Sequence, residues 1–256
     1  MSSILKKRIP ELESMKKYPK NIYYKGNLKL LNRKKVSIVG TRRPNLYTKN
    51  AVLRLSSSLS QRKVVVVSGA AMGVDTLAHN GAGAKNSIAV LASGINHIYP
   101  KINRNLINSI EQDGGLILSQ FDPEFTATIW SFVVRNELVV ALGEVLIVAQ
   151  ADLNSGSLRS VEFAKRMNKP IYVLPHRLGE SEGTNRLLKE GVAKAIYDIE
   201  EFADSFGSLE NDEDEFLKFC KESPSYEETL KKFGQRLFEA ELEGIVVVKD
   251  GRIYLS

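Results

Sequence analysis

The segment pattern between residues 36 and 174 constrains the fold of this sequence more than any other feature. Short runs that are apolar at nearly every position alternate with longer segments of helical spacing. Strands of this kind are typical of a parallel sheet that helices cover on both faces, because both sides of each strand are then buried. The predicted strands are 36–39, 64–67, 87–91, 116–118, 145–148 and 171–174, and the main predicted helices are 44–61, 102–113, 129–142 and 157–167.

This alternation predicts an α/β fold with a Rossmann-like, doubly wound, mostly parallel sheet. We assign the sheet domain to residues 1–206, of which 1–35 form a basic lead-in. Ligands of such sheets bind beyond the carboxyl ends of the strands. The loops that follow the strands are therefore the candidate site.

Positive charge is concentrated at the N-terminal end of the chain. Residues 1–63 hold 17 Lys and Arg against two acidic residues, whereas residues 201–256 hold 7 against 14. A basic block joined to the first parallel strand indicates a polyanionic partner, because clustered cations gain from releasing the counterions of phosphates. A solvated, charge-rich arm explains the same composition, so both interpretations stay open.

Beyond the predicted sheet the sequence changes character. Residues 207–214 combine glycine, serine and acidic residues, as expected of a linker. Residues 215–256 predict three short helices and a β-hairpin that turns at Asp250-Gly251, which is the order of a small winged-helix domain. Residues 208–256 hold 7 Lys and Arg against 12 Asp and Glu, so we expect this domain to contact protein rather than DNA.

Composition excludes several classes of protein. The chain has 256 residues, and its longest apolar run, 138–149, is interrupted by Gly143 and Glu144, far short of the roughly 20 apolar residues of a membrane helix. The N-terminus lacks the apolar core of a secretory signal, so we expect a cytoplasmic protein without membrane insertion. One cysteine, Cys220, and three scattered histidines give no metal-ligand spacing, and we expect neither a metal nor a cofactor.

Three turns at the predicted carboxyl edge carry groups suited to an anion. Glycines permit close approach of the backbone, hydroxyl and amide groups donate hydrogen bonds, and two arginines add forked, charge-assisted contacts. Because each turn precedes a predicted helix, together they predict a ledge for several phosphates in a row. The candidate residues are Gly40, Thr41, Arg42, Arg43, Asn154, Ser155, Gly156, Ser157 and Gly183.

Two further groups of residues join the candidate site. Ser68 and Gly69 begin a turn of small residues that serves either close helix packing or backbone approach to a ligand. Phe132, Arg135 and Asn136 lie on one predicted helix, and an aromatic ring beside basic and amide groups is suited to stacking an unpaired base. Aromatic residues of an amphipathic helix also serve as core, so that alternative stays open for Phe132 and for neighbouring Trp130.

The sequence offers few candidate catalytic residues. The chain has no G-x-S-x-G, H-E-x-x-H, G-x-G-x-x-G or phosphate-loop motif. Its acids near the predicted edge, Glu137, Asp152 and Glu162, have no titratable partner by spacing. We therefore expect a binding protein without catalytic residues.

These residues and their order resemble the DNA-processing protein A family, also called Smf. The resemblance covers nearly the whole chain. It rests on Ser37–Arg43, Val67–Asp75 with Ala78-His79, Phe132-x-x-Arg135-Asn136, Asn154–Leu158, Pro175, Gly183–Asn185 and Gly191.

The resemblance implies a non-enzymatic protein of natural transformation. Such a protein binds single-stranded DNA without sequence preference, protects it, and helps load the RecA recombinase in the presence of single-strand binding protein. It acts as a homodimer built from the Rossmann-like domain. The family's phosphate pocket would fall on 40–43 and 155–157, and its stacking aromatic on Phe132. Two departures are Asn154, where the family commonly has lysine, and Gln120, where a glutamate is frequent.

An enzyme is the main alternative. Nucleotide phosphoribohydrolases of the cytokinin-activating, lysine-decarboxylase-like type resemble this chain in their sheet and in a glycine-rich turn. Aligning that turn on Gly156-Ser157 places Ser160 where those enzymes have a catalytic glutamate, and Glu162 stands two positions later. A ligand-sensing repressor would need a basic recognition helix, whereas the segment 236–243 is acidic.

Overall fold

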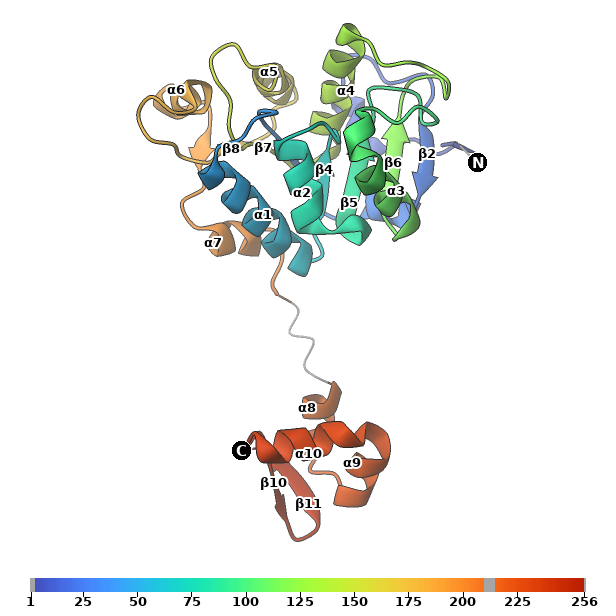
Figure 1. The fold of residues 1–256 in the computed structure, drawn as a ribbon, viewed down its shortest axis with the longest axis vertical. Helices are drawn as coiled ribbons and strands as arrows, with labels where there is room; N and C mark the ends of the chain where they lie inside the picture. Colours follow the sequence, from blue (N-terminus) through green and yellow to red (C-terminus); the bar gives the residue numbers. More distant parts are fainter. Residues whose placement is uncertain (1–2, 210–214, 256) are drawn as a thin grey trace. The chain divides into compact units, whose positions relative to one another are not determined.

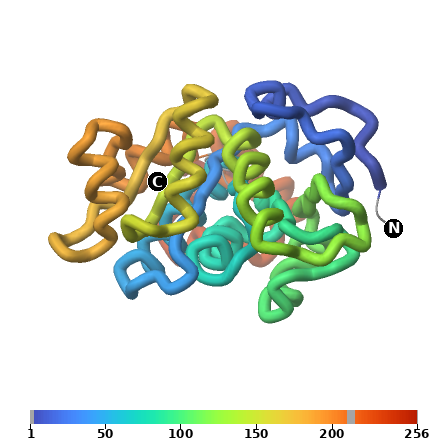
Figure 2. The backbone as a smooth tube through the Cα atoms, turned by 90° about the horizontal axis from the view of Figure 1, so that it is seen from above, coloured from blue at the N-terminus to red at the C-terminus, as the bar shows by residue number. Residues whose placement is uncertain are grey.

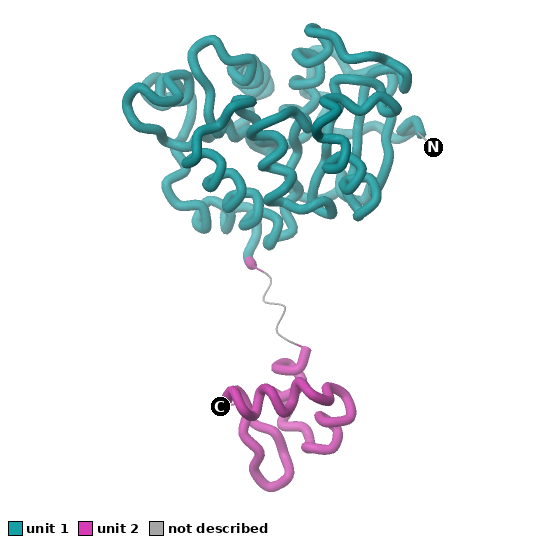
Figure 3. Tube along the Cα trace, viewed as in Figure 1, with its two compact units in different colours: residues 1–208 teal, residues 209–256 magenta. Residues whose placement is uncertain are grey.

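The chain forms two compact units in a computed structural model that describes residues 3–209 and 215–255. The first unit comprises residues 1–208 and the second residues 209–256 (Figure 3). Most of the predicted linker, residues 210–214, lies outside the described residues.

The first unit is built on one nine-stranded sheet within residues 3–209, in the order β1-β2-β6-β5-β4-β3-β7-β8-β9 (Figure 1). Every neighbouring pair from β6 to β9 is parallel, so the predicted doubly wound, mostly parallel sheet is confirmed. The strands are β1 (Ser3–Ile4), β2 (Tyr23–Gly26), β3 (Lys35–Val39), β4 (Val65–Ser68), β5 (Ser87–Val90), β6 (Leu116–Ser119), β7 (Val145–Val148), β8 (Ile171–Val173) and β9 (Lys194–Ala195).

Helices cover both faces of this sheet. Helices α1, α2 and α7 contribute buried apolar side chains to a hydrophobic core on one face of the sheet, and α4 and α5 contribute theirs to a second core on the other face (Figure 2). No helix of the described residues is long and apolar enough to cross a membrane. The α-helices are α1 (Leu46–Gln61), α2 (Val74–Ala82), α3 (Arg104–Gln112), α4 (Ile129–Leu142), α5 (Leu158–Arg166), α6 (Glu182–Lys189) and α7 (Ile199–Asp204); short 3-10 turns are η1 (Pro10–Ser14), η2 (Leu28–Asn32), η3 (Ala84–Asn86) and η4 (Lys101–Asn103).

The continuous apolar strands follow directly from this layering. Successive side chains of a strand point to opposite faces, so a strand between two helical layers needs apolar residues at every position. In β4, Val65 and Val67 join the cluster on the α4 face, whereas Val66 joins the cluster on the α1 face. All three are fully buried.

The N-terminal segment contributes more than a basic lead-in. Its strand β2 pairs antiparallel with β6, with Tyr24 opposite Leu118, and β1 pairs antiparallel with β2. Leu12 and Leu30 from the same segment are buried in the core. Residues 3–35 therefore complete one edge of the sheet, which neither the basic lead-in nor the alternative of a solvated arm described.

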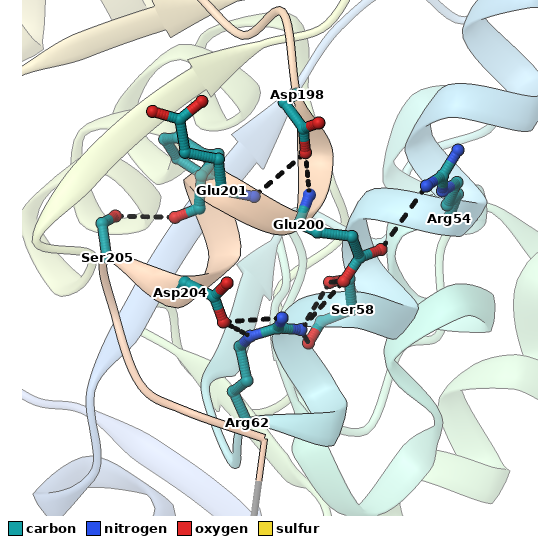
Figure 4. A network of polar contacts seen from close by, with 9 residues as sticks. Arg54, Ser58, Arg62, Asp198, Glu200, Glu201, Asp204 and Ser205 are labelled. Carbon is teal, nitrogen blue, oxygen red and sulfur yellow. Dashed lines mark hydrogen bonds and ion pairs between the residues drawn. The ribbon is translucent and has the colours of Figure 1, made fainter.

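A polar cluster fastens α7 to α1 (Figure 4). The Arg62 side chain, only 2% exposed, pairs with Asp204 at 2.7 Å and with Glu200 at 3.2 Å. Its guanidinium also donates to the Ser58 carbonyl at 3.0 Å. Asp198 caps α7 by accepting hydrogen bonds from the first backbone N–H groups of the helix. The C-terminal end of the first unit is thus tied to its core by one buried cation.

The second unit is a small helical domain with a hairpin. Its core comprises Phe216, Cys220, Leu237, Ala240, Val246 and Ile253. Both turn residues, Asp250 and Gly251, have positive φ, as the tight hairpin turn predicted from Asp-Gly requires. The winged-helix assignment stays a prediction. The elements are α8 (Glu215–Cys220), α9 (Tyr226–Phe233), α10 (Gln235–Leu242), β10 (Val246–Lys249) and β11 (Arg252–Leu255).

Candidate nucleic-acid interface

The sheet topology creates a crevice beside β3. The chain runs outward from β3 through β4, β5 and β6, and then returns by α4 to place β7 on the other side of β3. At such a switch point the loops after the two neighbouring strands diverge to opposite faces of the sheet. The loops after β3 and β7 therefore border a common opening, with the first turns of α4 above it.

A cleft of about 640 Å³ occupies this position. Ten of the predicted site residues line it, so the structure brings together loops that are more than 100 residues apart in sequence. Those ten are Gly40, Thr41, Arg42, Arg43, Phe132, Arg135, Asn136, Ser155, Gly156 and Ser157; Val39, Ala71, Asp75, Ile129, Val133, Asp152, Arg159 and Ser160 complete the lining.

The loop after β3 is held from both sides through Thr41. Its N–H donates to the Gln150 carbonyl at 2.9 Å, and its carbonyl accepts from the Val74 N–H at 3.1 Å. Its hydroxyl oxygen accepts from the Arg43 N–H at 3.2 Å, which leaves the hydroxyl proton for another acceptor. Helix α1 begins at Leu46, capped by Asn45, two residues after the predicted start at residue 44, so residues 40–43 precede the helix as a loop. The loop offers side chains rather than helix N–H groups.

The loop after β7 contributes uncharged donors and an open glycine. The Ser155 N–H donates to the Asp152 carbonyl at 2.9 Å, which closes the turn that leads into α5. A Cβ atom built on Gly156 would meet nothing within 4 Å, and its φ is not positive. Neither packing nor backbone strain requires glycine here, whereas a Cβ on Gly40 would lie 2.6 Å from a Val74 methyl. Gly156 thus keeps open the space into which a ligand would fit.

Phe132 is placed by three neighbours. Its ring meets that of Tyr99 edge-on, with centroids 5.6 Å apart. The guanidinium carbons of Arg42 and Arg135 lie 5.4 and 5.9 Å from the ring centroid, within cation–π range. Phe132 is only half-buried, so its ring borders the cleft instead of joining the core.

Two buried ionisable side chains, Arg135 and Asp75, form the floor of the cleft. Arg135 donates to the carbonyl of Gly69 and, at 2.9 Å, to that of Val90. These carbonyls lie at the carboxyl ends of β4 and β5, so one side chain fixes α4 to the sheet. Burial raises the pKa of the Asp75 carboxyl, and the Arg135 guanidinium opposes that rise.

His79 lies behind this floor. It is 1% exposed, and burial, with the positive charge of Arg135, lowers the pKa of its imidazole to about 4. The His79 ring is therefore neutral at physiological pH. Arg135, and not His79, supplies buried positive charge at the floor of the cleft.

Four predicted residues lie outside the cleft. Ser68 donates its hydroxyl to the Ile38 carbonyl at 2.7 Å, and a Cβ on Gly69 would collide with Arg135, so both serve packing. Gly183 is inside the first turn of α6 rather than before it, packed against the Ala151 carbonyl. Asn154 is exposed and lines a neighbouring hollow together with Thr41 and Ser155.

Sequence reasoning did not include Arg159, Ile129 or Asp75 in the site. Arg159 lies in the first turn of α5, three residues after Gly156. Because residues three apart at the start of a helix lie on the same side, this spacing could have indicated that the Arg159 side chain faces the cleft. Ile129 begins α4 and is 90% exposed, which is unusual for an isoleucine. Asp75 lies in the first turn of α2, where the sequence predicted a helix-start acid.

The cleft is cationic at its mouth. The exposed arginines Arg42, Arg43 and Arg159 have no acidic partner within 4 Å in the described part of the chain. Among the same described residues, no group of three His, Cys, Asp or Glu side chains could hold a metal ion. The arrangement is suited to an extended anion with a flat group beside it.

Comparison with known proteins identifies the family. The family described as DNA recombination-mediator protein A matches residues 2–207. This chain belongs to that family. The match covers the entire sheet domain and confirms the resemblance found in the sequence.

Three relatives illustrate the similarity. A solved structure concerning the single-stranded DNA binding mode of DNA processing protein A from Helicobacter pylori is 41% identical, with a TM-score of 0.77, and the match covers 80% of this chain and 94% of that one. DNA processing protein A from Streptococcus pneumoniae is 31% identical, with a TM-score of 0.74, covering 81% and 75%. The Bacillus subtilis protein is 33% identical over 74% of this chain and 65% of its own length. The chain matches 50 to 65% of the length of the first curated relatives.

Proposed function

We propose that this chain binds single-stranded DNA without sequence preference, with its phosphates in the cleft and a base on Phe132. The observation that carries the proposal is the convergence of two hydroxyl-bearing loops and three arginines, which have no acidic partner among the described residues, beside a half-buried aromatic ring. Phosphate contacts hold a strand in place without reading its sequence, and stacking tolerates every base.

The arrangement favours a single strand over a duplex. A duplex buries its base faces against one another, so it offers Phe132 nothing on which to stack. Arg42 is exposed and has no acidic partner in the described structure, so its guanidinium can turn from the ring to a phosphate when a base takes the ring face. The Helicobacter pylori relative, described as binding single-stranded DNA, supports this proposal.

We infer that the protein binds DNA and does not hydrolyse nucleotides. Glu162, the acid nearest the position of a phosphoribohydrolase glutamate, is 69% exposed at its side chain, 3.8 Å from Lys165, and does not line the cleft. The two acids that do line it are Asp75, which is buried against Ala71, and Asp152. Among the described residues, neither forms a side-chain hydrogen bond with a second acid, as a paired general acid and base would.

Family membership supports a proposal for the role in the cell. We propose that the protein acts in natural transformation in the cytoplasm, protects incoming single-stranded DNA and helps load RecA, in contact with single-strand binding protein. We further propose that it works as a homodimer through the sheet domain. The second unit, whose Arg236 is already 3.5 Å from Glu243, is proposed to contact protein rather than DNA.

A fluorescence-anisotropy titration tests the binding proposal. Labelled oligo-dT and a duplex of equal length would be titrated with the full chain at several salt concentrations. We expect preference for the single strand and affinity that falls steeply with salt. Absence of binding at low salt would refute the proposal, and release of ribose phosphate from nucleoside monophosphates would favour the enzyme instead.

A further inference from the structure

A second hollow adjoins the cleft at the start of α4. We define the Trp130 hollow by its lining: Thr128, Ile129, Trp130, Val133, Val134 and Arg159, with a volume of about 760 Å³. Apart from Thr128 and Arg159 its side chains are apolar. Ile129, Val133 and Arg159 also line the phosphate cleft, so the two spaces share one border.

Helical geometry explains why the two spaces are distinct yet continuous. Residues two apart on a helix point about 200° away from each other, so Trp130 and Phe132 face different sides of α4. Ile129 and Val133 are four apart and form the row between them. A chain that passes around the first turn of α4 would therefore meet Phe132 on one side and Trp130 on the other.

Trp130 is fixed in place and still accessible. Its ring packs at 78° against Phe121 and at 60° against Phe125, with centroids 5.5 and 5.6 Å apart. The Thr128 N–H donates to the Ser131 hydroxyl at 3.0 Å, which fixes the start of the helix. Even so, 55% of Trp130 is exposed. A large ring that is rigidly supported and open to solvent loses little entropy when it binds a flat group.

We propose that Trp130 is a second stacking platform, which takes another base of the strand held in the cleft. This proposal rests on the proposed function and extends the binding path across Arg159. The charge of that arginine suits the phosphate between the two bases, since it has no acidic partner in the described residues.

Charge distinguishes this occupant from a second copy of the chain. Residues 1–206 hold 29 Lys and Arg against 18 Asp and Glu. A second copy docked here by a symmetric contact would place its own Arg159 against the first, because both copies then use the same patch, whereas a polyanion meets Arg159 with attraction. An apolar hollow bordered by Arg159, which has no acidic partner within the described ranges, matches a nucleotide, which carries a flat base beside a phosphate.

The experiment uses the fact that Trp130 is the only tryptophan of the sequence. Unlabelled oligo-dT would be added to the full chain while tryptophan emission is recorded, and anisotropy of a labelled oligo-dT would be followed in parallel. We expect quenching that saturates at the same DNA concentration as the anisotropy change. The variant Trp130→Leu should weaken binding roughly tenfold without changing its salt slope, and Trp130→Phe should restore most of the affinity.

The outcomes separate this proposal from the proposed function. Strand binding by anisotropy without quenching, and with full affinity of Trp130→Leu, overturns the stacking role of Trp130 and leaves the proposed function intact. Absence of strand binding overturns both. A change of emission with protein concentration alone identifies a second copy as the occupant and overturns the proposal. Equal thermal stability of the variants and the parent would show that a loss of affinity is a loss of contact.

Discussion

The substitution Arg42→Ala tests the phosphate cleft most directly. Three exposed arginines line its mouth, and each neutralised phosphate of a single strand contributes about 0.7 to the slope of log affinity against log salt. Three contacts give a slope of about −2, and loss of Arg42 reduces it to about −1.4. Between about 50 and 200 mM salt, affinity should then fall roughly 18-fold for the parent and roughly 7-fold for the variant.

The assay is the anisotropy titration with labelled oligo-dT, repeated at four or more salt concentrations. Arg54→Ala is the matched control, because Arg54 loses the same charge but lies outside the cleft, 3.7 Å from Glu200. We expect the control to keep the slope of the parent. Parallel lines for Arg42→Ala and the parent, or an equal change in Arg54→Ala, would refute the assignment of phosphates to this cleft.

Four further substitutions test the glycine loop, the buried histidine and the α7 attachment. Gly156→Val should fold normally, because nothing lies within 4 Å of its Cβ, and should weaken strand binding about tenfold by filling the cleft; unchanged affinity contradicts this. Between pH 6.5 and about 4 the unfolded chain protonates His79 but the folded chain does not. As the pH is lowered through this range, the free energy of unfolding should therefore decrease by up to about 3 kcal/mol more in the parent than in His79→Gln. Urea unfolding at each pH measures this difference, and equal pH dependence of the two proteins would show that His79 titrates normally. Arg62→Ala should cost about 2–3 kcal/mol of unfolding free energy, and Asp204→Ala less, because the Asp204 side chain is 57% exposed; equal losses in chemical denaturation would contradict the burial argument.

The sequence was sufficient for the parallel strands β3 to β8 because burial on both faces leaves a continuous apolar run, whereas the two-residue parallel strand β9 has no such run and was not predicted. β7 was predicted at its observed bounds, 145–148, for this reason. β1 and β2 were missed because an antiparallel edge pair needs no such run. Tyr23-Tyr24-Lys25-Gly26 forms its hydrogen bonds with β6 through the backbone, which no side-chain pattern records.

The candidate site was predictable where topology alone brings residues together. The loops after β3 and β7 meet in any doubly wound sheet of this order, so 40–43 and 155–157 could be assigned from sequence. Packing decided the remaining residues. The Arg135 side chain occupies the space that a Cβ on Gly69 would take, and the Ala151 carbonyl occupies the space that a Cβ on Gly183 would take. Both contacts depend on how closely the helices approach the strands. Glycine spacing alone could not distinguish these from Gly156.

The anchoring of α4 by Arg135 has a consequence for the speed of recognition. Its guanidinium joins the helix to the carbonyl ends of two strands, so the first turns of α4 are part of the rigid sheet and not of a mobile loop. A surface that rearranges side chains but not its backbone binds at a rate set by encounter, and arginines without an acidic partner among the described residues raise that rate by attracting the polyanion. We expect association in a single kinetic phase that slows with added salt, so that the strength of binding is adjusted mainly by how fast the strand leaves.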